Sequence, residues 1–205
     1  MTITTPLEPG CFYHLYNRGN NREIIFREER NYAYFLKQWK KHISPVADTY
    51  AYCLLGNHFH VLIRVKESIL AEKMSDMSRM NQAEQHLANF FNAYAKGFNK
   101  TYSRSGKLFE ERFKKKKVTS NRYFTQLIYY IHSNAQRHGF IHDFREYPHS
   151  SFPSILSERP TKLFRQEVLD WFGGTDQFKA FHLDLHRKLL DLDRFIIEDD
   201  EDCTL

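Results

Sequence analysis

The sequence predicts an α+β protein in which one antiparallel sheet has helices packed on one face. Short runs rich in aromatic and β-branched residues alternate with longer segments whose apolar residues recur at helical spacing. Turn-forming Gly and Asn residues separate several of these segments. The resulting order is β-α-β-β-α-β followed by a further helix, which is the split β-α-β arrangement of ferredoxin-like domains.

The first half of the chain supplies three strands and one helix of this pattern. Residues 11–18 are aromatic and alternate in polarity, which predicts a strand. Residues 28–43 carry large apolar side chains three and four positions apart, so a helix follows. The apolar runs 48–55 and 59–65 flank a Gly-Asn pair, which predicts a β-hairpin whose second strand begins near His58.

The second half completes the domain. Residues 67–99 contain apolar positions with helical period and predict a long helix. Residues 107–118 alternate again and predict one or two strands with a cationic face. Residues 119–121 offer an N-cap for a third helix, which Gly139 ends as a C-cap. We therefore expect the ferredoxin-like domain to occupy residues 1–155.

A small helical extension is expected over residues 156–205. Serine and proline at 150–160 predict a linker, and the segments 162–172 and 177–195 each predict a helix. The acidic run at 198–202 is typical of a disordered end.

Charge is unevenly distributed along the chain. Of its 205 residues, 1–160 hold 24 Lys and Arg against 14 Asp and Glu, whereas 161–205 hold 6 against 11. The densest basic stretch, residues 100–117, interleaves cations with Tyr102, Phe109 and Phe113. Cations mixed with rings that can stack on bases suit a nucleic-acid strand. A solvated basic face without any partner is the competing interpretation.

The sequence also excludes several classes of protein. It contains no run of eighteen uncharged apolar residues, and its N-terminus lacks the features of a signal peptide, so neither a membrane span nor secretion is expected. Three widely spaced cysteines, Cys11, Cys53 and Cys203, exclude a disulfide framework and a CxxC metal site. A cytoplasmic location is expected.

The motif His58-Phe59-His60 is a candidate metal site. Residues two apart on a strand point to the same face about 6.5–7 Å apart, so two imidazoles can share one divalent ion. Two histidines leave coordination positions open for another ligand and for substrate. The alternative is that both histidines are ordinary polar surface.

A tyrosine and an asparagine on the third predicted helix are the candidate partners of this site. Tyr130 and Asn134 are four residues apart, so the phenol and the amide oxygen can converge one turn apart on one helix face. A tyrosine can attack a phosphodiester covalently when a metal polarises the phosphate. Alternatively, Tyr129 and Tyr130 are half-buried aromatics and Asn134 is a polar residue near the helix end.

Four stretches, in order, carry a resemblance to a known family. The chain resembles the single-tyrosine transposases of bacterial insertion sequences, marked by His-hydrophobe-His on a strand and a lone tyrosine on a later helix. Within them it is most similar to the REP-associated tyrosine transposases. With the sequence between them, the stretches cover about residues 10–155. They are FYHLYNRGNNREIIF (12–26), YCLLGNHFHVLIRV (52–65), GKLFEERFKKKKV (106–118) and YYIHSNAQRHGF (129–140).

The resemblance implies roles for individual residues. His58 and His60 match the metal-binding pair, Tyr130 the nucleophile that forms a 5′-phosphotyrosine with single-stranded DNA, and Asn134 the residue completing the metal site. The implied ion is Mg²⁺ or Mn²⁺, because the DNA phosphate adds hard oxygen ligands. DNA binding is expected of the basic residues Arg18, Lys107, Arg112, Lys114, Lys115, Lys116 and Lys117.

The expected partner is a single-stranded DNA hairpin with a single-stranded flank, bound by a monomer or a homodimer, with rings such as Tyr102 or Phe109 stacking on bases. Two other functions stay open at this stage. One is a domesticated protein that holds DNA or RNA hairpins without cutting them. The other is a hydrolytic metal nuclease in which water attacks. Tyr129 also competes with Tyr130, because an alignment error of one residue would exchange them.

Overall fold

The computed structural model describes residues 6–67, 76–111 and 113–191 of the 205-residue chain. The chain forms two compact units, residues 1–165 and residues 166–205. Within the described residues, no helix has both the length and the apolar character that crossing a membrane requires.

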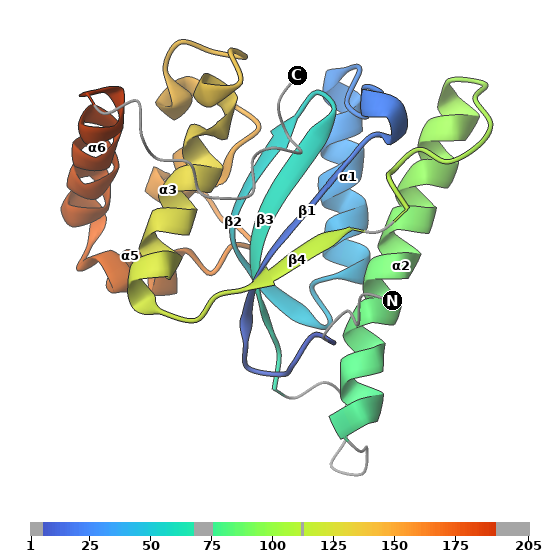
Figure 1. Cartoon of the computed structure of the whole chain (residues 1–205), viewed down its shortest axis with the longest axis horizontal. Coiled ribbons are helices and arrows are strands. Elements are labelled where there is room, and N and C mark those ends of the chain that lie inside the picture. The colour runs from blue at the N-terminus through green and yellow to red at the C-terminus, as the bar shows by residue number, and fades with distance from the viewer. Residues whose placement is uncertain (1–5, 68–75, 112, 192–205) are drawn as a thin grey trace. The chain divides into compact units, whose positions relative to one another are not determined.

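The first unit is built on a four-stranded antiparallel sheet with the strand order β2-β3-β1-β4 (Figure 1). This order and the all-antiparallel pairing confirm the predicted α+β class. The central strands β1 and β3 are each paired on both sides, whereas β2 and β4 are edges. The strand bounds are β1 Phe12–Arg18, β2 Ala47–Leu55, β3 His58–Val65 and β4 Lys114–Lys117.

Helices connect the strands in the predicted order. The three long helices follow β1, β3 and β4, so the chain runs β-α-β-β-α-β-α. The predicted helix over 67–99 corresponds to α2, although residues 68–75 lie outside the described part. The helices of the first unit are η1 Asn20–Arg22, α1 Glu29–His42, α2 Asp76–Thr101, α3 Asn121–Arg137, η2 Phe144–Glu146 and α4 Ser151–Leu156.

Local sequence signals define the ends of α3, the helix that carries Tyr130. The Ser120 hydroxyl accepts a hydrogen bond from the Tyr123 backbone N–H, as an N-cap does. Gly139 follows the helix with φ of +71°, a conformation that glycine adopts without strain. Both caps agree with the sequence prediction, and together they fix where α3 begins and ends.

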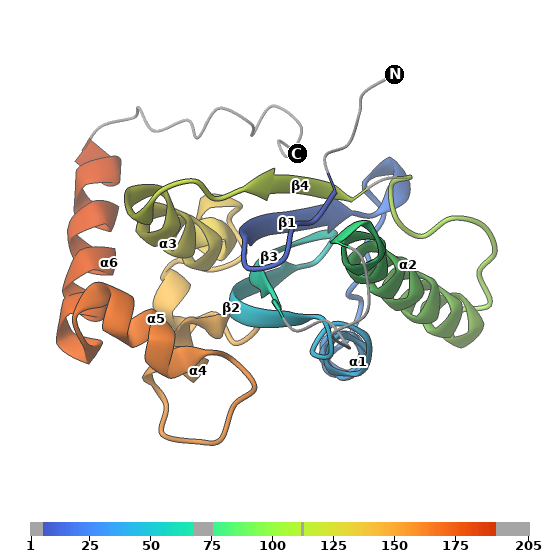
Figure 2. The same cartoon turned by 90° about the horizontal axis from the view of Figure 1, so that it is seen from below.

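One face of the sheet packs against α1 and α2 and forms the hydrophobic core (Figure 2). Phe59 from β3 is at the centre of this core and is 1% exposed. Its ring centroid lies 5.0 Å from that of Phe35 on α1, which in turn lies 4.9 Å from Phe90 on α2. The first pair is tilted and the second is edge-to-face, and such close packing of rings contributes beyond the apolar area that it buries.

The opposite face of the sheet packs against α3. Phe124 of α3 contacts Phe12 of β1, with ring centroids 5.0 Å apart, and α3 also contacts β2 and β3. The expectation that the helices share one face is therefore wrong for α3. Both faces are covered because β1 and β3 carry large side chains on both sides of the strand.

The predicted linker at 150–160 is wrong in part, because Ser151–Leu156 form the helix α4. The Ser150 hydroxyl caps this helix by accepting from the Phe152 backbone N–H. The buried Ser151 hydroxyl accepts a hydrogen bond of 2.8 Å from the Tyr52 backbone N–H on the edge strand β2. Ser150 thus caps α4, and Ser151 anchors it to the sheet.

The second unit contains the two helices predicted for the extension. The pair Gly173-Gly174, both with positive φ, separates α5 (Arg165–Phe172) from α6 (Thr175–Asp191). The acidic run 198–202 and Cys203 lie outside the described residues.

Candidate active site

His58 and His60 lie on the sheet face that α3 covers. The Gly56-Asn57 turn ends β2, and β3 begins directly at His58. Strand alternation points Phe59 into the core of α1 and α2 and both histidines to the other side. The two imidazole centroids are 5.3 Å apart. The structure thus brings this pair together as the motif predicts.

Each histidine uses its Nδ1 in a hydrogen bond inside the protein. His58 Nδ1 lies 2.7 Å from Asn57 Oδ1, and His60 Nδ1 lies 3.0 Å from Nε2 of His14 on β1. The Nε2 atoms of His58 and His60 are buried and have no hydrogen-bond partner among the described residues. Two imidazole nitrogens are therefore left for a ligand that the protein itself does not provide.

Burial sets the charge of this histidine pair. Burial, assisted by the nearby His138 and Arg18, lowers the pKa of His58 to about 3. Burial also lowers the pKa of His60 well below the usual value, assisted by His14 and His58. Both imidazoles are therefore neutral at pH 7, and a neutral imidazole is the form that binds metal ions.

Tyr130 faces the histidine pair from α3. Its ring centroid lies 5.6 Å from that of His60 and 6.0 Å from that of His14, in edge-to-face geometry. The neighbouring Tyr129 points elsewhere, because its ring lies 6.0 Å from Phe144 of η2. Of the two tyrosines that the sequence left in competition, the one packed against the histidines is Tyr130.

Asn134 lies one turn after Tyr130 on α3 and is fully buried. Its Nδ2 donates a hydrogen bond of 2.9 Å to the Tyr130 carbonyl oxygen. Its Oδ1 is buried without a hydrogen-bond partner among the described residues, as are the Nε2 atoms of His58 and His60. These three side chains therefore offer two nitrogens and one oxygen, a donor set that fits a divalent cation.

Protein ligands alone would not complete such a site. Within the described ranges, no three His, Cys, Asp or Glu side chains come together as a metal-binding group. An ion held by two histidines and one asparagine would keep open coordination positions. Phosphate oxygens of a substrate are hard ligands that would fill them.

Arg137 and His138 also lie at the site, although neither was among the residues predicted from the sequence. The Arg137 guanidinium lies 5.0 Å from the centroid of the Tyr130 ring. The His138 ring lies 4.9 Å from that of His58. Arg137 follows Tyr130 by seven residues, two helical turns, so helical spacing alone could have selected it.

The four lysines of β4 divide between the two faces of the sheet. Lys114 Nζ lies 6.0 Å from the Tyr16 ring and Lys116 Nζ lies 5.7 Å from the Tyr123 ring of α3, so both are on the histidine side. Lys115 and Lys117 are on the opposite side, where they pair with Glu84 and Glu8, respectively. The basic run that the sequence predicts is therefore divided into two pairs of lysines on opposite faces of the sheet.

The remaining predicted DNA-binding residues are Arg18, Lys107 and Arg112, and of these Arg18 lies beside the histidine pair. Arg18 faces His58 in the pairing of β1 with β3, and it forms an ion pair with Glu110. Lys107 is exposed and pairs with Glu111. Arg112 lies outside the described residues.

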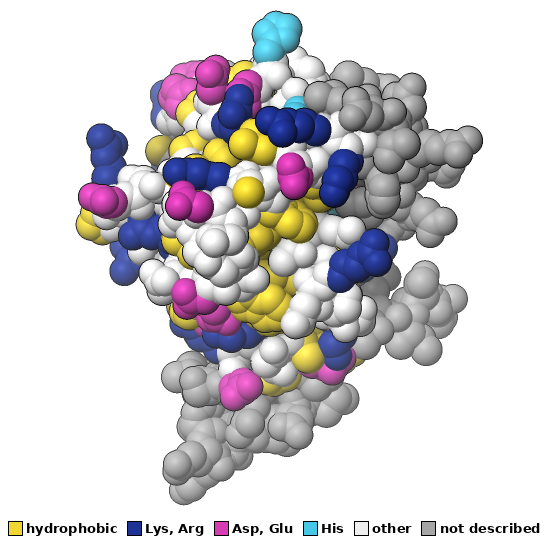
Figure 3. Space-filling view, turned by 90° about the vertical axis from the view of Figure 1, so that its left-hand side faces the viewer, with side chains coloured by type: hydrophobic (Ala, Val, Ile, Leu, Met, Phe, Trp, Pro, Cys, Tyr) yellow, Lys and Arg dark blue, Asp and Glu magenta, His cyan; other side chains and the backbone are white. Residues whose placement is uncertain are grey.

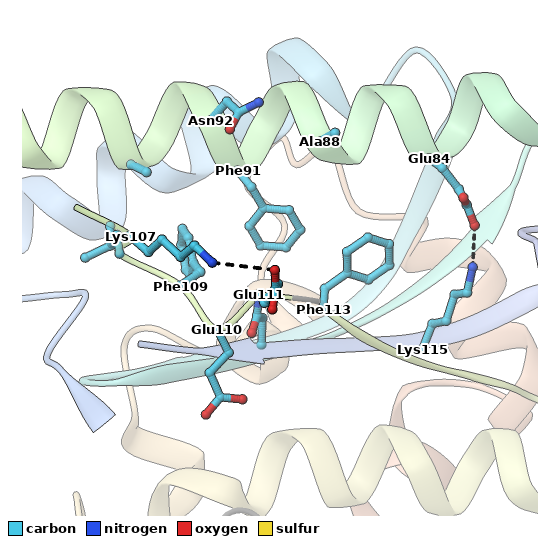
Figure 4. Close-up of a pocket in the computed structure, with 13 residues that line it drawn as sticks. Glu84, Ala88, Phe91, Asn92, Lys107, Phe109, Glu110, Glu111, Phe113 and Lys115 are labelled. Carbon is cyan, nitrogen blue, oxygen red and sulfur yellow. Dashed lines mark hydrogen bonds and ion pairs between the residues drawn. The ribbon is translucent and has the colours of Figure 1, made fainter. Parts of the chain in front are cut away.

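A groove of about 450 Å³ lies on the α2 side of the sheet, away from the histidines (Figure 4). The rings of Phe91 and Phe113 stack inside it with centroids 5.6 Å apart. Glu84, Glu110 and Glu111 are among its lining residues. Each of these carboxylates is paired with a cation, Glu84 with Lys115, Glu110 with Arg18 and Glu111 with Lys107. Because the groove lies on the face of the sheet opposite the histidines, it does not extend the candidate active site.

The two rings proposed to stack on bases contact other side chains of the protein. Phe109 is 7% exposed and packs in the core against Phe91 and Tyr94, so the expectation for Phe109 is wrong. The Tyr102 ring lies 4.7 Å from the Arg27 guanidinium. The side of the molecule in Figure 3 mixes basic, acidic and apolar side chains.

Comparison with known proteins supports the fold assignment. No family model matches the chain, and no curated protein matches it. A solved structure has a similar fold. It is described as a REP-associated tyrosine transposase bound to a REP hairpin, and it aligns with a TM-score of 0.54 over 78% of this chain and 88% of that chain. The two sequences are 15% identical, so this similarity shows a shared fold.

The depressed pKa of His58 predicts its behaviour in acid. We expect its imidazole to stay neutral from pH 7 down to about pH 4, because burial opposes protonation. Since an unfolded histidine protonates near pH 6.5, His58 should reduce the free energy of unfolding by up to about 1.4 kcal/mol per pH unit as the pH falls from 6.5 toward 3. NMR titration of ¹⁵N-labelled histidine would measure the pKa, and protonation of His58 near pH 6.5 would contradict the prediction.

Proposed function

We propose that the protein is a metal-assisted endonuclease and strand transferase, related to the REP-associated tyrosine transposases, that acts on single-stranded DNA through Tyr130. The observation that carries the proposal is the position of the Tyr130 ring beside His60, whose Nε2, like His58 Nε2 and Asn134 Oδ1, is buried without a hydrogen-bond partner among the described residues. The solved structure with a similar fold is of a transposase bound to a REP hairpin, which supports a DNA hairpin as the substrate.

The ion-binding residues in this proposal are His58, His60 and Asn134. Their Nε2, Nε2 and Oδ1 atoms, respectively, would hold Mg²⁺ or Mn²⁺. The bound ion would polarise the scissile phosphate and offset the charge that develops on it. Binding an ion would leave the other hydrogen bonds of these side chains in place. Asn57 and His14 contact the Nδ1 atoms of His58 and His60, and the Tyr130 carbonyl accepts from Asn134 Nδ2.

The covalent step belongs to Tyr130. Its phenolic oxygen attacks the phosphorus, a new O–P bond forms, and the bond from phosphorus to the 3′ oxygen breaks. The 3′ oxygen leaves as a hydroxyl, taking up a proton, while the phenol loses its own. The 5′ end stays on the enzyme, so a 3′-OH can reverse the attack without ATP. The cationic Arg137 beside the ring favours the negative charge that builds up on the phenolic oxygen.

Lys114 and Lys116 would bind the backbone of the DNA strand. In the sheet, Tyr16 is paired with His60 on one side and with Lys114 on the other. The lysines are therefore two strands away from the histidines, on the same face. Cations at this spacing can hold phosphates that neighbour the one under attack.

Substitution of single tyrosines tests the covalent step. We expect the wild-type protein and Tyr129→Phe to form a denaturation-resistant adduct with a labelled single-stranded hairpin in Mn²⁺, and Tyr130→Phe to form none, since only Tyr130 faces the histidines. A denaturing gel separates the adduct from free DNA.

The other outcomes of this experiment identify other functions. Cleavage without an adduct would indicate hydrolysis by water and contradict the covalent step. Binding without cleavage would indicate a protein that holds hairpins. An adduct lost only in Tyr129→Phe would exchange the roles of the two tyrosines.

Paired lysine substitutions test the DNA-binding face. We expect the double variant Lys114→Ala/Lys116→Ala to bind the hairpin more weakly. The slope of log Kd against log salt concentration should fall by about 1.4, because two single-strand phosphate contacts are lost. Lys115→Ala/Lys117→Ala removes the same net charge from the opposite face and is the matched control. Equal losses in both double variants, measured by fluorescence anisotropy, would contradict a face-specific contact.

Metal binding provides a separate test. We expect His58→Ala, His60→Ala and Asn134→Ala each to weaken Mn²⁺ binding at least about tenfold, because removing a ligand should cost no less than removing one of its supporting contacts. Exposed His142 gives the control variant His142→Ala. Isothermal titration calorimetry measures the affinity, and unchanged affinity in all three variants would contradict this ligand set.

A further inference from the structure

His14 is a buried polar residue to which the proposed reaction assigns no step. It lies on β1 and is 6% exposed. Its Nε2 lies 3.0 Å from His60 Nδ1, and the two rings stack with centroids 5.1 Å apart and an angle of 23° between their planes. Its Nε2 is therefore directed at the Nδ1 side of His60 and not at the side where the Nε2 atoms of His58 and His60 have no partner in the described part of the chain.

A hydrogen bond between two imidazoles contains one proton, so one nitrogen donates and the other accepts. When His60 Nδ1 donates to His14, the neutral His60 ring has its lone pair on Nε2. When His14 donates, the neutral His60 ring has its proton on Nε2, where no described atom accepts it. The second arrangement leaves a buried donor unsatisfied and provides no metal ligand, so the structure favours the first.

The neighbouring histidine shows the same arrangement with less ambiguity. His58 Nδ1 lies 2.7 Å from the side-chain oxygen of Asn57, and an amide oxygen only accepts. His58 thus has its proton on Nδ1 and its lone pair on Nε2. The two histidines of the motif therefore have equivalent surroundings, with a hydrogen-bond acceptor at Nδ1 and no described partner at Nε2.

We propose that His14 is a positioning residue that accepts the Nδ1 proton of His60 and thereby holds the His60 Nε2 lone pair toward a divalent cation. The inference rests on the proposed function, because it gives the cation as the ligand. Outer hydrogen bonds of this kind fix the tautomer and orientation of metal-binding histidines. His14 itself must then have its proton on Nδ1.

A structural role is the competing explanation, because the His14 ring also stacks 4.8 Å from Tyr16 and lies 6.0 Å from Tyr130. Two substitutions separate these roles. His14→Gln retains an acceptor oxygen near the position of Nε2 but removes the ring. His14→Phe retains a ring of similar shape but removes the acceptor.

The first measurement is Mn²⁺ affinity without DNA, by isothermal titration calorimetry. We expect His14→Phe to weaken binding about 10- to 100-fold and His14→Gln to stay within about threefold of wild type. Equal affinity in wild type and His14→Phe would overturn the proposal. A loss in His14→Gln as large as that in His14→Phe would overturn it as well, since the ring itself would then be what matters.

The second measurement needs no metal and no substituted protein. ¹⁵N NMR of histidine-labelled wild-type protein at pH 7 distinguishes the two neutral tautomers of His60. We expect the proton on Nδ1, and a proton on Nε2 would overturn the proposal even if His14→Phe fails to fold.

The two measurements also separate this inference from the proposed function. If wild-type protein and His58→Ala both fail to bind Mn²⁺, the proposed function loses its metal. The tautomer of His60 in the wild-type protein would still show whether His14 acts as the acceptor. A shift of the His60 proton from Nδ1 to Nε2 in His14→Phe would still support that role.

Discussion

The alternation of β3 is the constraint on which the rest of the site depends. Phe59, Val61 and Ile63 are buried in the core with α1 and α2, so the even-numbered positions must face α3. A shift of one residue would place imidazoles in the hydrophobic core and phenylalanine in the site. Because β3 is paired on both sides along its length, the core that stabilises the fold also fixes where His58 and His60 point.

The second feature of the site is the use of burial to control charge. Burying an imidazole disfavours its protonated form, so the depressed pKa of His58 and His60 follows from their position under α3. Neutrality alone leaves two tautomers available to each ring. The hydrogen bonds at Nδ1 select between them, and the partners come from the turn before β3 and from the neighbouring strand β1. Secondary structure thus determines proton positions as well as distances.

Much of this arrangement could be predicted from sequence because it depends on local periodicity. A two-residue period places His58 and His60 together, and a four-residue period places Tyr130 and Asn134 together. The contacts of His14 could not be predicted in this way, because they depend on which residues of β1 face which residues of β3. The position of α3 on the second face and the helix at Ser151–Leu156 likewise depend on tertiary contacts that outweigh local signals.

The four lysines of β4 show how a sequence feature changes meaning once it is placed in the fold. Charged residues on a short edge strand are a common way to prevent sheets from associating, and this explanation covers all four. It does not explain why the two lysines on the α2 side are paired with Glu84 and Glu8, whereas those on the histidine side lie over the rings of Tyr16 and Tyr123. The rings of Tyr16 and Tyr123 hold the ammonium groups of Lys114 and Lys116 on the face where Tyr130 and the histidine pair lie, which is where a bound DNA strand would need positive charge.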